Sequence, residues 1–282
     1  MRKRYQNGQA LVIVLLSLSV VLTLVLFILS RSITDIASSS RDEESVRAFS
    51  AAEAGIEQAL VIGSSVGYTT LSDSSYSASV TSIGEGSTQF NYPVSLWSGD
   101  TATFWFVAHD ETGATICSVD KPCFTGDSVK VCWGRSGTSA SSATTPAIEA
   151  SIFYNSTPDD YSTAEIARVT LDPHTSRANS TNFTQANTNG CTIDEQTYQF
   201  HSTISLPAGD LQFMRIRALY NSDEKQIFGI DGISDIFPAQ GMLINSSGVS
   251  GESNRRIEVF QGWSSAPSVF DFAVFSPTGL TK

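Results

Sequence analysis

Positive charge is scarce in this sequence. Its 282 residues include 17 Lys and Arg against 28 Asp and Glu, which gives a formal net charge of −11 at pH 7. No basic run follows Arg4. Because binding to a phosphate backbone needs clustered Lys and Arg, the composition argues against a nucleic-acid partner.

Residue patterns of catalytic and metal sites are also scarce. The 3 histidines are solitary in the sequence, and the segment His109-Asp110-Glu111 is interpreted as a polar cluster at a strand end. Serine is abundant, yet we expect no nucleophile elbow, and the acidic pairs Asp159-Asp160 and Asp231/Asp235 lack EF-hand spacing. We therefore predict that the protein is not an enzyme and that it binds no cofactor and no metal.

Helix breakers are missing from the N-terminal part of the chain. After Gly8 the next Gly is Gly55, and the first Pro is Pro93. Residues 10–29 carry no charge, and about 20 helical residues span about 30 Å, the thickness of the hydrocarbon core of a bilayer. We predict one continuous helix over residues 9–61, with a transmembrane part at residues 10–29.

The basic residues before this helix predict its orientation. Arg2, Lys3 and Arg4 hold the N-terminus in the cytoplasm, which places residues 62–282 on the outer side of the membrane. A secretory signal peptide is the alternative, but its apolar region is usually about 7–15 residues long. The longer run favours a helix that is retained.

Beyond the bilayer the helix is expected to be amphipathic. Val46, Phe49, Ile56 and Leu60 recur at helical spacing, and Glu53 takes the position between Phe49 and Ile56. We expect this stripe to dock on the chain's own globular domain. Glu53 has two interpretations, a charge at the edge of the stripe or an electrostatic contact with a neighbouring helix.

The N-terminus resembles a known processing site. The stretch Gly8-Gln9-Ala10-Leu11-Val12 resembles a class III prepilin site, in which a short basic leader ends in Gly before an apolar helix. With "AFSAAEAGIEQAL" (48–60), and with residues 240–276 less specifically, the chain resembles PilX-type minor pilins of type IV pili and, less closely, GspK-like pseudopilins of type II secretion.

The resemblance implies a pathway and a set of partners. Prepilin peptidase would cut between Gly8 and Gln9 and remove the leader, residues 1–8. The helix would lie in the lipid bilayer before assembly, with an extracytoplasmic head, and would then join an extracellular pilus. Implied partners are major and other minor pilins and the inner-membrane pilus assembly machinery.

Two positions depart from the pattern of major pilins. These proteins carry Glu as the fifth mature residue, where it meets the N-terminal amine of an adjoining subunit, and here that position is Ile13. The departure favours a minor role at low copy or at the filament tip, including assembly priming. Gln9 replaces the usual aromatic first residue, which leaves its N-methylation open.

The chain after the helix predicts a β-rich head, and hence an α+β fold. Short β-branched and aromatic runs alternate with Gly, Pro, Asn, Asp and Ser. The Ser/Thr/Gly-rich segment 134–146 suggests two sub-lobes, residues 62–140 and 146–282. The expected strands are Tyr76–Ile83, Thr101–Ala108, Ser128–Trp133, Ala147–Tyr154, Glu165–Leu171, Tyr198–Leu206, Leu211–Tyr220, Gln226–Ile230, Arg256–Gln261 and Phe270–Phe275.

The 4 cysteines all lie in the exported part. An even number there predicts two disulfides, because oxidation persists outside the cytoplasm. Three connectivities are open. We favour Cys117–Cys123, which brackets a turn, together with Cys132–Cys191, which would join the two lobes.

Two functional classes follow. In the first, the protein is a minor pilin or pseudopilin that takes part in assembly and presents its head for adhesion or aggregation. In the second, it is a single-pass surface protein whose helix is only an anchor and whose head binds a ligand. The N-terminus of the mature protein, Gln9 in the first class and Met1 or Arg2 in the second, distinguishes them.

Overall fold

A computed structural model describes residues 9–267, with side chains from Leu11 onward. The chain forms two compact units. The helix unit contains the chain up to Val80 together with Ile244–Val259, and the sandwich unit contains Thr81–Leu243 and the chain from Phe260. The division expected near residues 134–146 is therefore not where the units separate, because that segment lies inside the sandwich unit.

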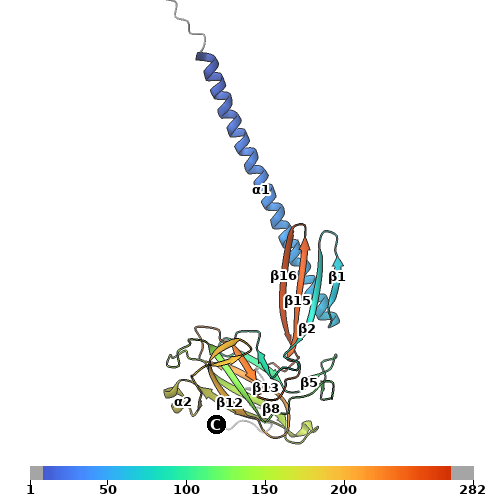
Figure 1. The fold of residues 1–282 in the computed structure, drawn as a ribbon, viewed down its shortest axis with the longest axis vertical. Coiled ribbons are helices and arrows are strands. Elements are labelled where there is room, and N and C mark those ends of the chain that lie inside the picture. Colours follow the sequence, from blue (N-terminus) through green and yellow to red (C-terminus); the bar gives the residue numbers. More distant parts are fainter. Residues whose placement is uncertain (1–8, 268–282) are drawn as a thin grey trace, which may run out of the picture. The chain divides into compact units, whose positions relative to one another are not determined.

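One helix dominates the N-terminal part of the chain. Helix α1 (Gln9–Ile62) runs without interruption through the apolar and the amphipathic stretches, as the lack of helix breakers predicts (Figure 1). It ends where Gly63 takes a left-handed conformation (φ 66°) and donates its N–H to the carbonyl of Ala59 (2.9 Å). This is a glycine cap that satisfies one of the last free carbonyls of the helix.

A sheet lies along the C-terminal part of α1 in the helix unit (Figure 1). Its strand order is β1 (Val66–Thr70), β2 (Ser75–Ile83), β15 (Gly241–Ser250) and β16 (Ser253–Gly262). The unit boundaries fall inside β2, β15 and β16. The core between helix and sheet is small and consists of Ala51, Ile56, Ala59, Val66, Tyr76, Ala78 and Ile244.

The sandwich unit contains two five-stranded sheets. The first has the order β10 (Thr184–Gln185), β9 (Ala164–Asp172), β8 (Ala147–Asn155), β13 (Asp210–Leu219) and β4 (Thr101–Trp105). The second has the order β11 (Cys191–Ile193), β12 (Gln196–Ser205), β7 (Ser128–Arg135), β14 (Phe228–Asp231) and β3 (Gln89–Asn91).

Inward side chains of both sheets share one hydrophobic core. Ile152 and Met214 come from the first sheet, and Trp133, Phe200 and Phe228 come from the second. All five are completely buried. The two sheets therefore pack face to face, as layers that each bury one apolar face do.

Short elements complete the sandwich unit. The hairpin of β5 (Ala108–His109) and β6 (Thr115–Ile116) pairs antiparallel. A 3₁₀ helix, η1 (Tyr161–Thr163), and the helix α2 (Thr175–Thr181) flank β9.

The predicted α+β fold is confirmed. Each strand expected before residue 262 overlaps an observed one, with Thr101–Ala108 divided between β4 and β5. The strand expected at Phe270–Phe275 lies outside the described residues. The ten-residue strand β15 is not among the predicted strands.

Candidate functional site

The first half of α1 contacts nothing else in the described chain. All side chains from Leu11 to Leu29 are exposed, although nearly all are apolar. Ser17, Ser19 and Thr23 donate their hydroxyls to helix carbonyls three residues earlier at 2.8–2.9 Å, so these polar groups are satisfied within the helix. Helix α1 is long and apolar enough to be a single-pass membrane anchor.

The residues assigned to processing and assembly lie at the start of this anchor. Gly8 lies outside the described residues, and Gln9 is the first residue of α1. The side chain of Ile13 is 64% exposed and lies among other aliphatic side chains. No acidic or basic residue occurs between Leu11 and Ser30, so the side chains of this part of α1 cannot form an ion pair with a neighbouring subunit.

The second half of α1 docks through small residues. Ala48, Ala51, Ala52 and Ala59 are buried, as are Gly55 and Ile56 between them. The expectation that Val46, Phe49 and Leu60 form the docking stripe is wrong, because these side chains are exposed. Of the predicted stripe, only Ile56 lies on the buried face.

Glycines set the distance between α1 and β15. A Cβ on Gly248 would collide with the backbone of Ala48 and Ala52, and a Cβ on Gly55 would collide with the hydroxyl of Ser246. The helix backbone therefore lies directly against the strand backbone. Larger side chains at these positions would force the helix off the sheet.

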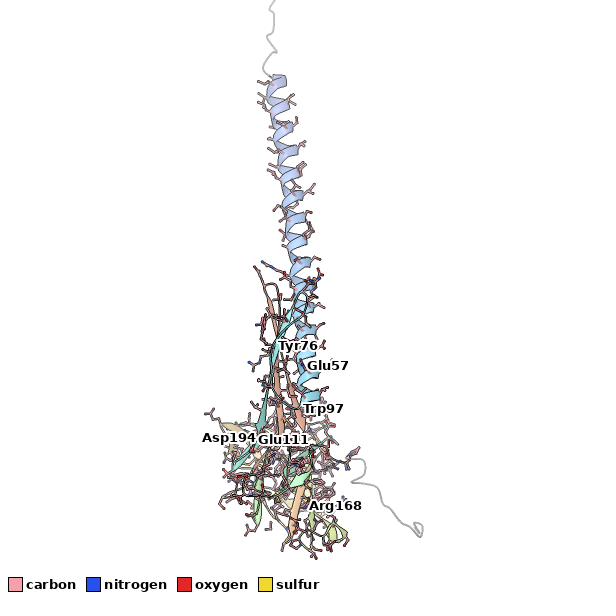
Figure 2. All side chains as sticks on the ribbon, turned by 90° about the vertical axis from the view of Figure 1, so that its right-hand side faces the viewer. Glu57, Tyr76, Trp97, Glu111, Arg168 and Asp194 are labelled. Atoms are coloured by element: carbon pink, nitrogen blue, oxygen red, sulfur yellow. A yellow bond between two sulfur atoms is a disulfide. The ribbon has the colours of Figure 1, made fainter. Side chains whose placement is uncertain are left out.

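Three polar contacts fix α1 along the sheet, one near each end and a third beside the second. Near the end of the helix, the Tyr76 hydroxyl donates to Oε1 of Gln58 (2.6 Å), and Figure 2 shows Tyr76 beside α1. At the other end of the sheet, Glu44 accepts the backbone N–H of Glu252 (3.1 Å) in the β15–β16 turn.

The third contact joins α1 to β16. The Arg255 guanidinium donates to Oγ of Ser45 at 2.6 Å. Such contacts fix register along the helix, which an alanine face alone does not specify.

The large apolar residues and Glu53 form an exposed stripe on the docked half of α1. The exposed stripe consists of Val46, Phe49, Glu53 and Leu60. Glu53 forms no ion pair or hydrogen bond with any residue between 9 and 267, so its carboxylate points to solvent. Glu43 and Arg47, four residues apart on the helix, form an exposed ion pair (2.5 Å).

Two disulfides lie in the sandwich unit, with the favoured connectivity. Cys117–Cys123 (Cα–Cα 5.3 Å) closes a short loop after β6. Cys132–Cys191 (Cα–Cα 6.0 Å) links β7 to β11, so it joins two strands of one sheet and not two lobes. Disulfides are typical of proteins outside the reducing cytoplasm, which fits an extracytoplasmic head.

The three histidines lie on separate elements. His109 in β5 is buried against Trp105, and burial lowers its pKa to about 4. His174 caps α2 by accepting the N–H of Arg177 (3.2 Å), and His201 in β12 contacts Asn189 (3.0 Å). These contacts give each imidazole a structural role.

The acidic candidates cap turns of the chain. Asp110 accepts from the N–H groups of Thr112 (2.8 Å) and Ala114 (3.0 Å), and its hydrogen bonds with these residues lower its pKa. Asp160 caps η1 in the same way. Within residues 9–267, no three His, Cys, Asp or Glu side chains gather as metal ligands would.

The sequence also contains one motif of a catalytic serine that was not predicted. Residues Gly63–Gly67 match the pattern G-x-S-x-G, with Ser65 at the serine position. A nucleophile elbow lies between a strand and a helix, whereas Ser65 follows α1 and precedes β1. Its hydroxyl accepts the N–H of Val80 (2.9 Å), so it is a strand-edge contact.

Comparison with protein-family models, with curated proteins and with solved structures finds no match.

Proposed function

We propose that the protein is a minor pilin, a low-copy or tip component that takes part in the assembly of a type IV pilus. In this proposal prepilin peptidase removes residues 1–8, and the mature chain begins at Gln9. The outward head then serves in adhesion or aggregation. The head is an interaction module without catalytic or cofactor chemistry.

One observation carries the proposal, the continuity of α1 across two environments. The helix is exposed and almost entirely apolar from Leu11 to Leu29, and it continues without a break into a half that docks on a sheet. An apolar surface of this extent is unfavourable in water, so the apolar half needs lipid or other helices. A subunit that moves from a membrane into the helical core of a filament needs a continuous helix of this kind, with one apolar half and one half that carries the head.

The identity of Ile13 supports a minor position. A free N-terminal amine that enters an apolar filament core is costly unless a carboxylate meets it, because a buried unpaired charge costs several kcal/mol. Ile13 brings no carboxylate, and the exposed apolar half of α1 has none elsewhere. Such a subunit fits a tip or priming complex, where no neighbouring amine has to be neutralised.

The proposed partners follow from the exposed apolar surface of α1. Before assembly the apolar half lies in the bilayer of the inner membrane. Major and other minor pilins then replace the lipid around it, with the inner-membrane assembly machinery as the site of exchange. Phe49 and Leu60 on the exposed stripe extend this apolar surface outside the bilayer, and Glu53 adds one negative charge to it.

N-terminal analysis of the mature protein tests the proposal. We expect the purified chain to begin at Gln9, and the variant Gly8→Asp to accumulate as a precursor of higher mass in the membrane. The matched control Asn7→Ser changes the neighbouring leader residue and should be processed normally. A mature protein that begins at Met1 or Arg2 would favour the alternative, a single-pass surface protein that binds a ligand.

Copurification separates the two filament classes. A minor pilin should copurify with a major pilin whose fifth mature residue is Glu, and this should require processing at Gly8. Copurification with the components of a type II secretion system would assign the chain to the GspK-like pseudopilins.

A further inference from the structure

An aromatic row crosses the outer face of the first sheet of the sandwich unit. Phe213 in β13 lies opposite Trp105 in β4 and Phe153 in β8, and Phe153 lies opposite Ile166 in β9. The neighbouring residues Phe104, Ile152 and Met214 point into the core, so these four side chains point away from it. We call Trp105, Phe213, Phe153 and Ile166 the aromatic row.

The side chains of the aromatic row follow one another across the sheet, with Trp105 buried (6% exposed) and Phe153 and Phe213 half-buried. The ring centroids of Phe153 and Phe213 are 4.3 Å apart with nearly parallel planes, and those of Phe213 and Trp105 are 5.0 Å apart. The Ile166 side chain at its far end is 47% exposed. The accessible part of the row runs over three strands, from Phe213 through Phe153 to Ile166, and is contiguous, unlike the single exposed apolar residues of an ordinary surface.

Arginines lie beside the aromatic row on the same face. In the next row of side chains, Arg215 and Arg168 flank Ser151, with one arginine in β13 and the other in β9. The guanidinium of Arg215 lies 5.3 Å from the Phe213 ring centroid, and Arg168 pairs with Glu149 (2.9 Å). Figure 2 labels Arg168 on this unit. Arg215 is almost completely buried (3% exposed), whereas Arg168 is exposed, so Arg168 and its partner Glu149 are the charged groups that this part of the face presents.

The chain after β16 already lies on one end of this face. Trp263 stacks on His109 (centroids 4.6 Å, 11° between planes), and His109 in turn contacts Trp105 at 4.4 Å. The indole N–H of Trp263 donates to the carbonyl of Ala239 (2.8 Å). Three residues later, the Arg215 guanidinium donates to the carbonyl of Ala266. The chain has therefore moved from β4 to β13 by residue 266.

We propose that the continuation of the chain, residues 268–282, packs on the aromatic row and covers it. From β13 to β9 is two strand spacings, about 10 Å, which an extended chain crosses in about three or four residues. Counting from Ala266, this brings Phe270 to Ile166 and Asp271 to Arg168. The sequence Val269–Phe275 reads VFDFAVF, so it supplies both aromatic rings and a carboxylate to this face.

Chemistry on both sides supports this occupant. Aromatic side chains bury a large area each and pair favourably with other rings, so Phe270 and Phe272 would gain by covering Phe153 and Phe213. Asp271 is the only charged residue between Glu258 and Lys282 along the chain, and it would meet an arginine. This proposal does not depend on the minor-pilin proposal.

Photo-crosslinking of the full chain in detergent tests the contact. We place p-benzoylphenylalanine at Ile166, and at Thr203 as the control, an exposed position in β12 of the other sheet. We expect the Ile166 probe to form an intramolecular crosslink that fragment spectra locate between Ser268 and Lys282. The Thr203 probe should give none there.

Loss of the tail's aromatic residues should remove this crosslink. The double variant Phe270→Ser/Phe272→Ser should lower its yield roughly tenfold, the change that about 1.4 kcal/mol produces in an equilibrium. The matched control is Thr278→Ser, which alters the same tail but keeps its aromatic residues and should leave the yield unchanged.

Three results would overturn the proposal. These are a crosslink from Ile166 to a second copy of the chain, a crosslink to any segment before residue 268, or the absence of a crosslink. The first would show that the aromatic row is a contact between copies. The other two would show that the tail lies elsewhere.

Discussion

The helix unit and the sandwich unit bury side chains of different size. Between α1 and its sheet the buried face of the helix consists mainly of Ala and Gly, and the larger members of the core are Ile56, Val66, Tyr76 and Ile244. The sandwich core buries Trp133 and a set of phenylalanines completely. The difference shows that one chain uses close backbone approach in one region and large buried rings in the other.

Each kind of packing fits the secondary structure that it joins. A sheet pair has room between its layers, about 10 Å, which large side chains fill. When a helix docks through a face of small residues, its large apolar residues stay exposed and can contact other partners. Val46, Phe49 and Leu60 are therefore available on the outside of α1, where an ordinary amphipathic helix would bury them.

Spectroscopy can follow the two units separately. All 4 tryptophans, at positions 97, 105, 133 and 263, belong to the sandwich unit, so tryptophan fluorescence reports on that unit. The helical circular dichroism signal comes mainly from α1.

The largest effect is expected from truncation of a sandwich core ring. Phe228→Ala removes a completely buried side chain and should cost about 4 kcal/mol of the free energy of unfolding, through lost burial and a cavity. Denaturant unfolding followed by tryptophan fluorescence measures this. The control Phe49→Ala removes an exposed ring of α1 and should change stability in detergent by less than about 0.5 kcal/mol. Equal losses in both variants would contradict the comparison.

The two disulfides should differ in their effect on the sandwich unit. Cys132 and Cys191 are 59 residues apart, and Cys117 and Cys123 are 6 apart. Loop-closure entropy predicts that replacing the first pair by Ala costs about 4 kcal/mol and the second about 2 kcal/mol. The same fluorescence transition, measured under oxidising conditions, ranks them. A larger loss for the short loop would show that loop entropy does not govern these bonds.

A single methyl group should separate α1 from its sheet. Gly248→Ala places a Cβ against the backbone of Ala48 and Ala52 and should destabilise the helix unit by about 2 kcal/mol. Limited proteolysis after α1 and the melting of the circular dichroism signal measure the loss. Gly67→Ala is the matched control, because no atom lies within 4 Å of the added Cβ. If both variants behave alike, close backbone approach does not hold the helix.

The smallest effect is a pH dependence confined to the sandwich unit. Burial lowers the pKa of His109 from 6.5 to about 4, while Asp110 raises it and Lys121 lowers it further. Between these values the unfolded chain binds a proton that the folded chain does not, so stability falls as pH decreases from 6.5 to 4. We expect His109→Phe to flatten this slope in fluorescence melts, and His201→Gln to flatten it less. An unchanged slope in His109→Phe would exclude His109 as its source.

Some of the fold could be predicted because its signals are local. The length of α1 follows from the absence of Gly and Pro, and its end follows from Gly63. The long strands β8, β9, β12 and β13 carry alternating or β-branched sequences that indicate strands directly.

Two of the errors, the docking stripe and the missed strand β15, share one physical cause, the use of small residues for packing. The largest apolar residues of α1 predict the docking stripe, whereas the buried face belongs to the alanines. Strand β15 reads GMLINSSGVS, with the Gly, Asn and Ser of a typical loop. Gly248 and Ser246 are needed there because α1 lies so close. Because the close contact with α1 requires small residues in β15, this strand lacks the β-branched and aromatic residues that would have predicted it.

Only some features of the candidate site could be predicted from the sequence. The membrane anchor and the disulfide pairs follow from residue types and compartment, and the structure agrees with both. The aromatic row could not be predicted, because its members come from four strands whose register no local pattern specifies. Processing at Gly8 and the role of Ile13 stay predictions from the sequence.

Hydrogen exchange along α1 measures directly whether its second half docks on the sheet. In the full chain in detergent, measured by mass spectrometry, amides of residues 48–59 should exchange much more slowly than those of residues 31–42, because only the former lie on the docked half. Gly248→Ala should remove this difference, and Gly67→Ala should keep it. Fast exchange over residues 48–59 in the unmodified chain would contradict docking through the alanine face.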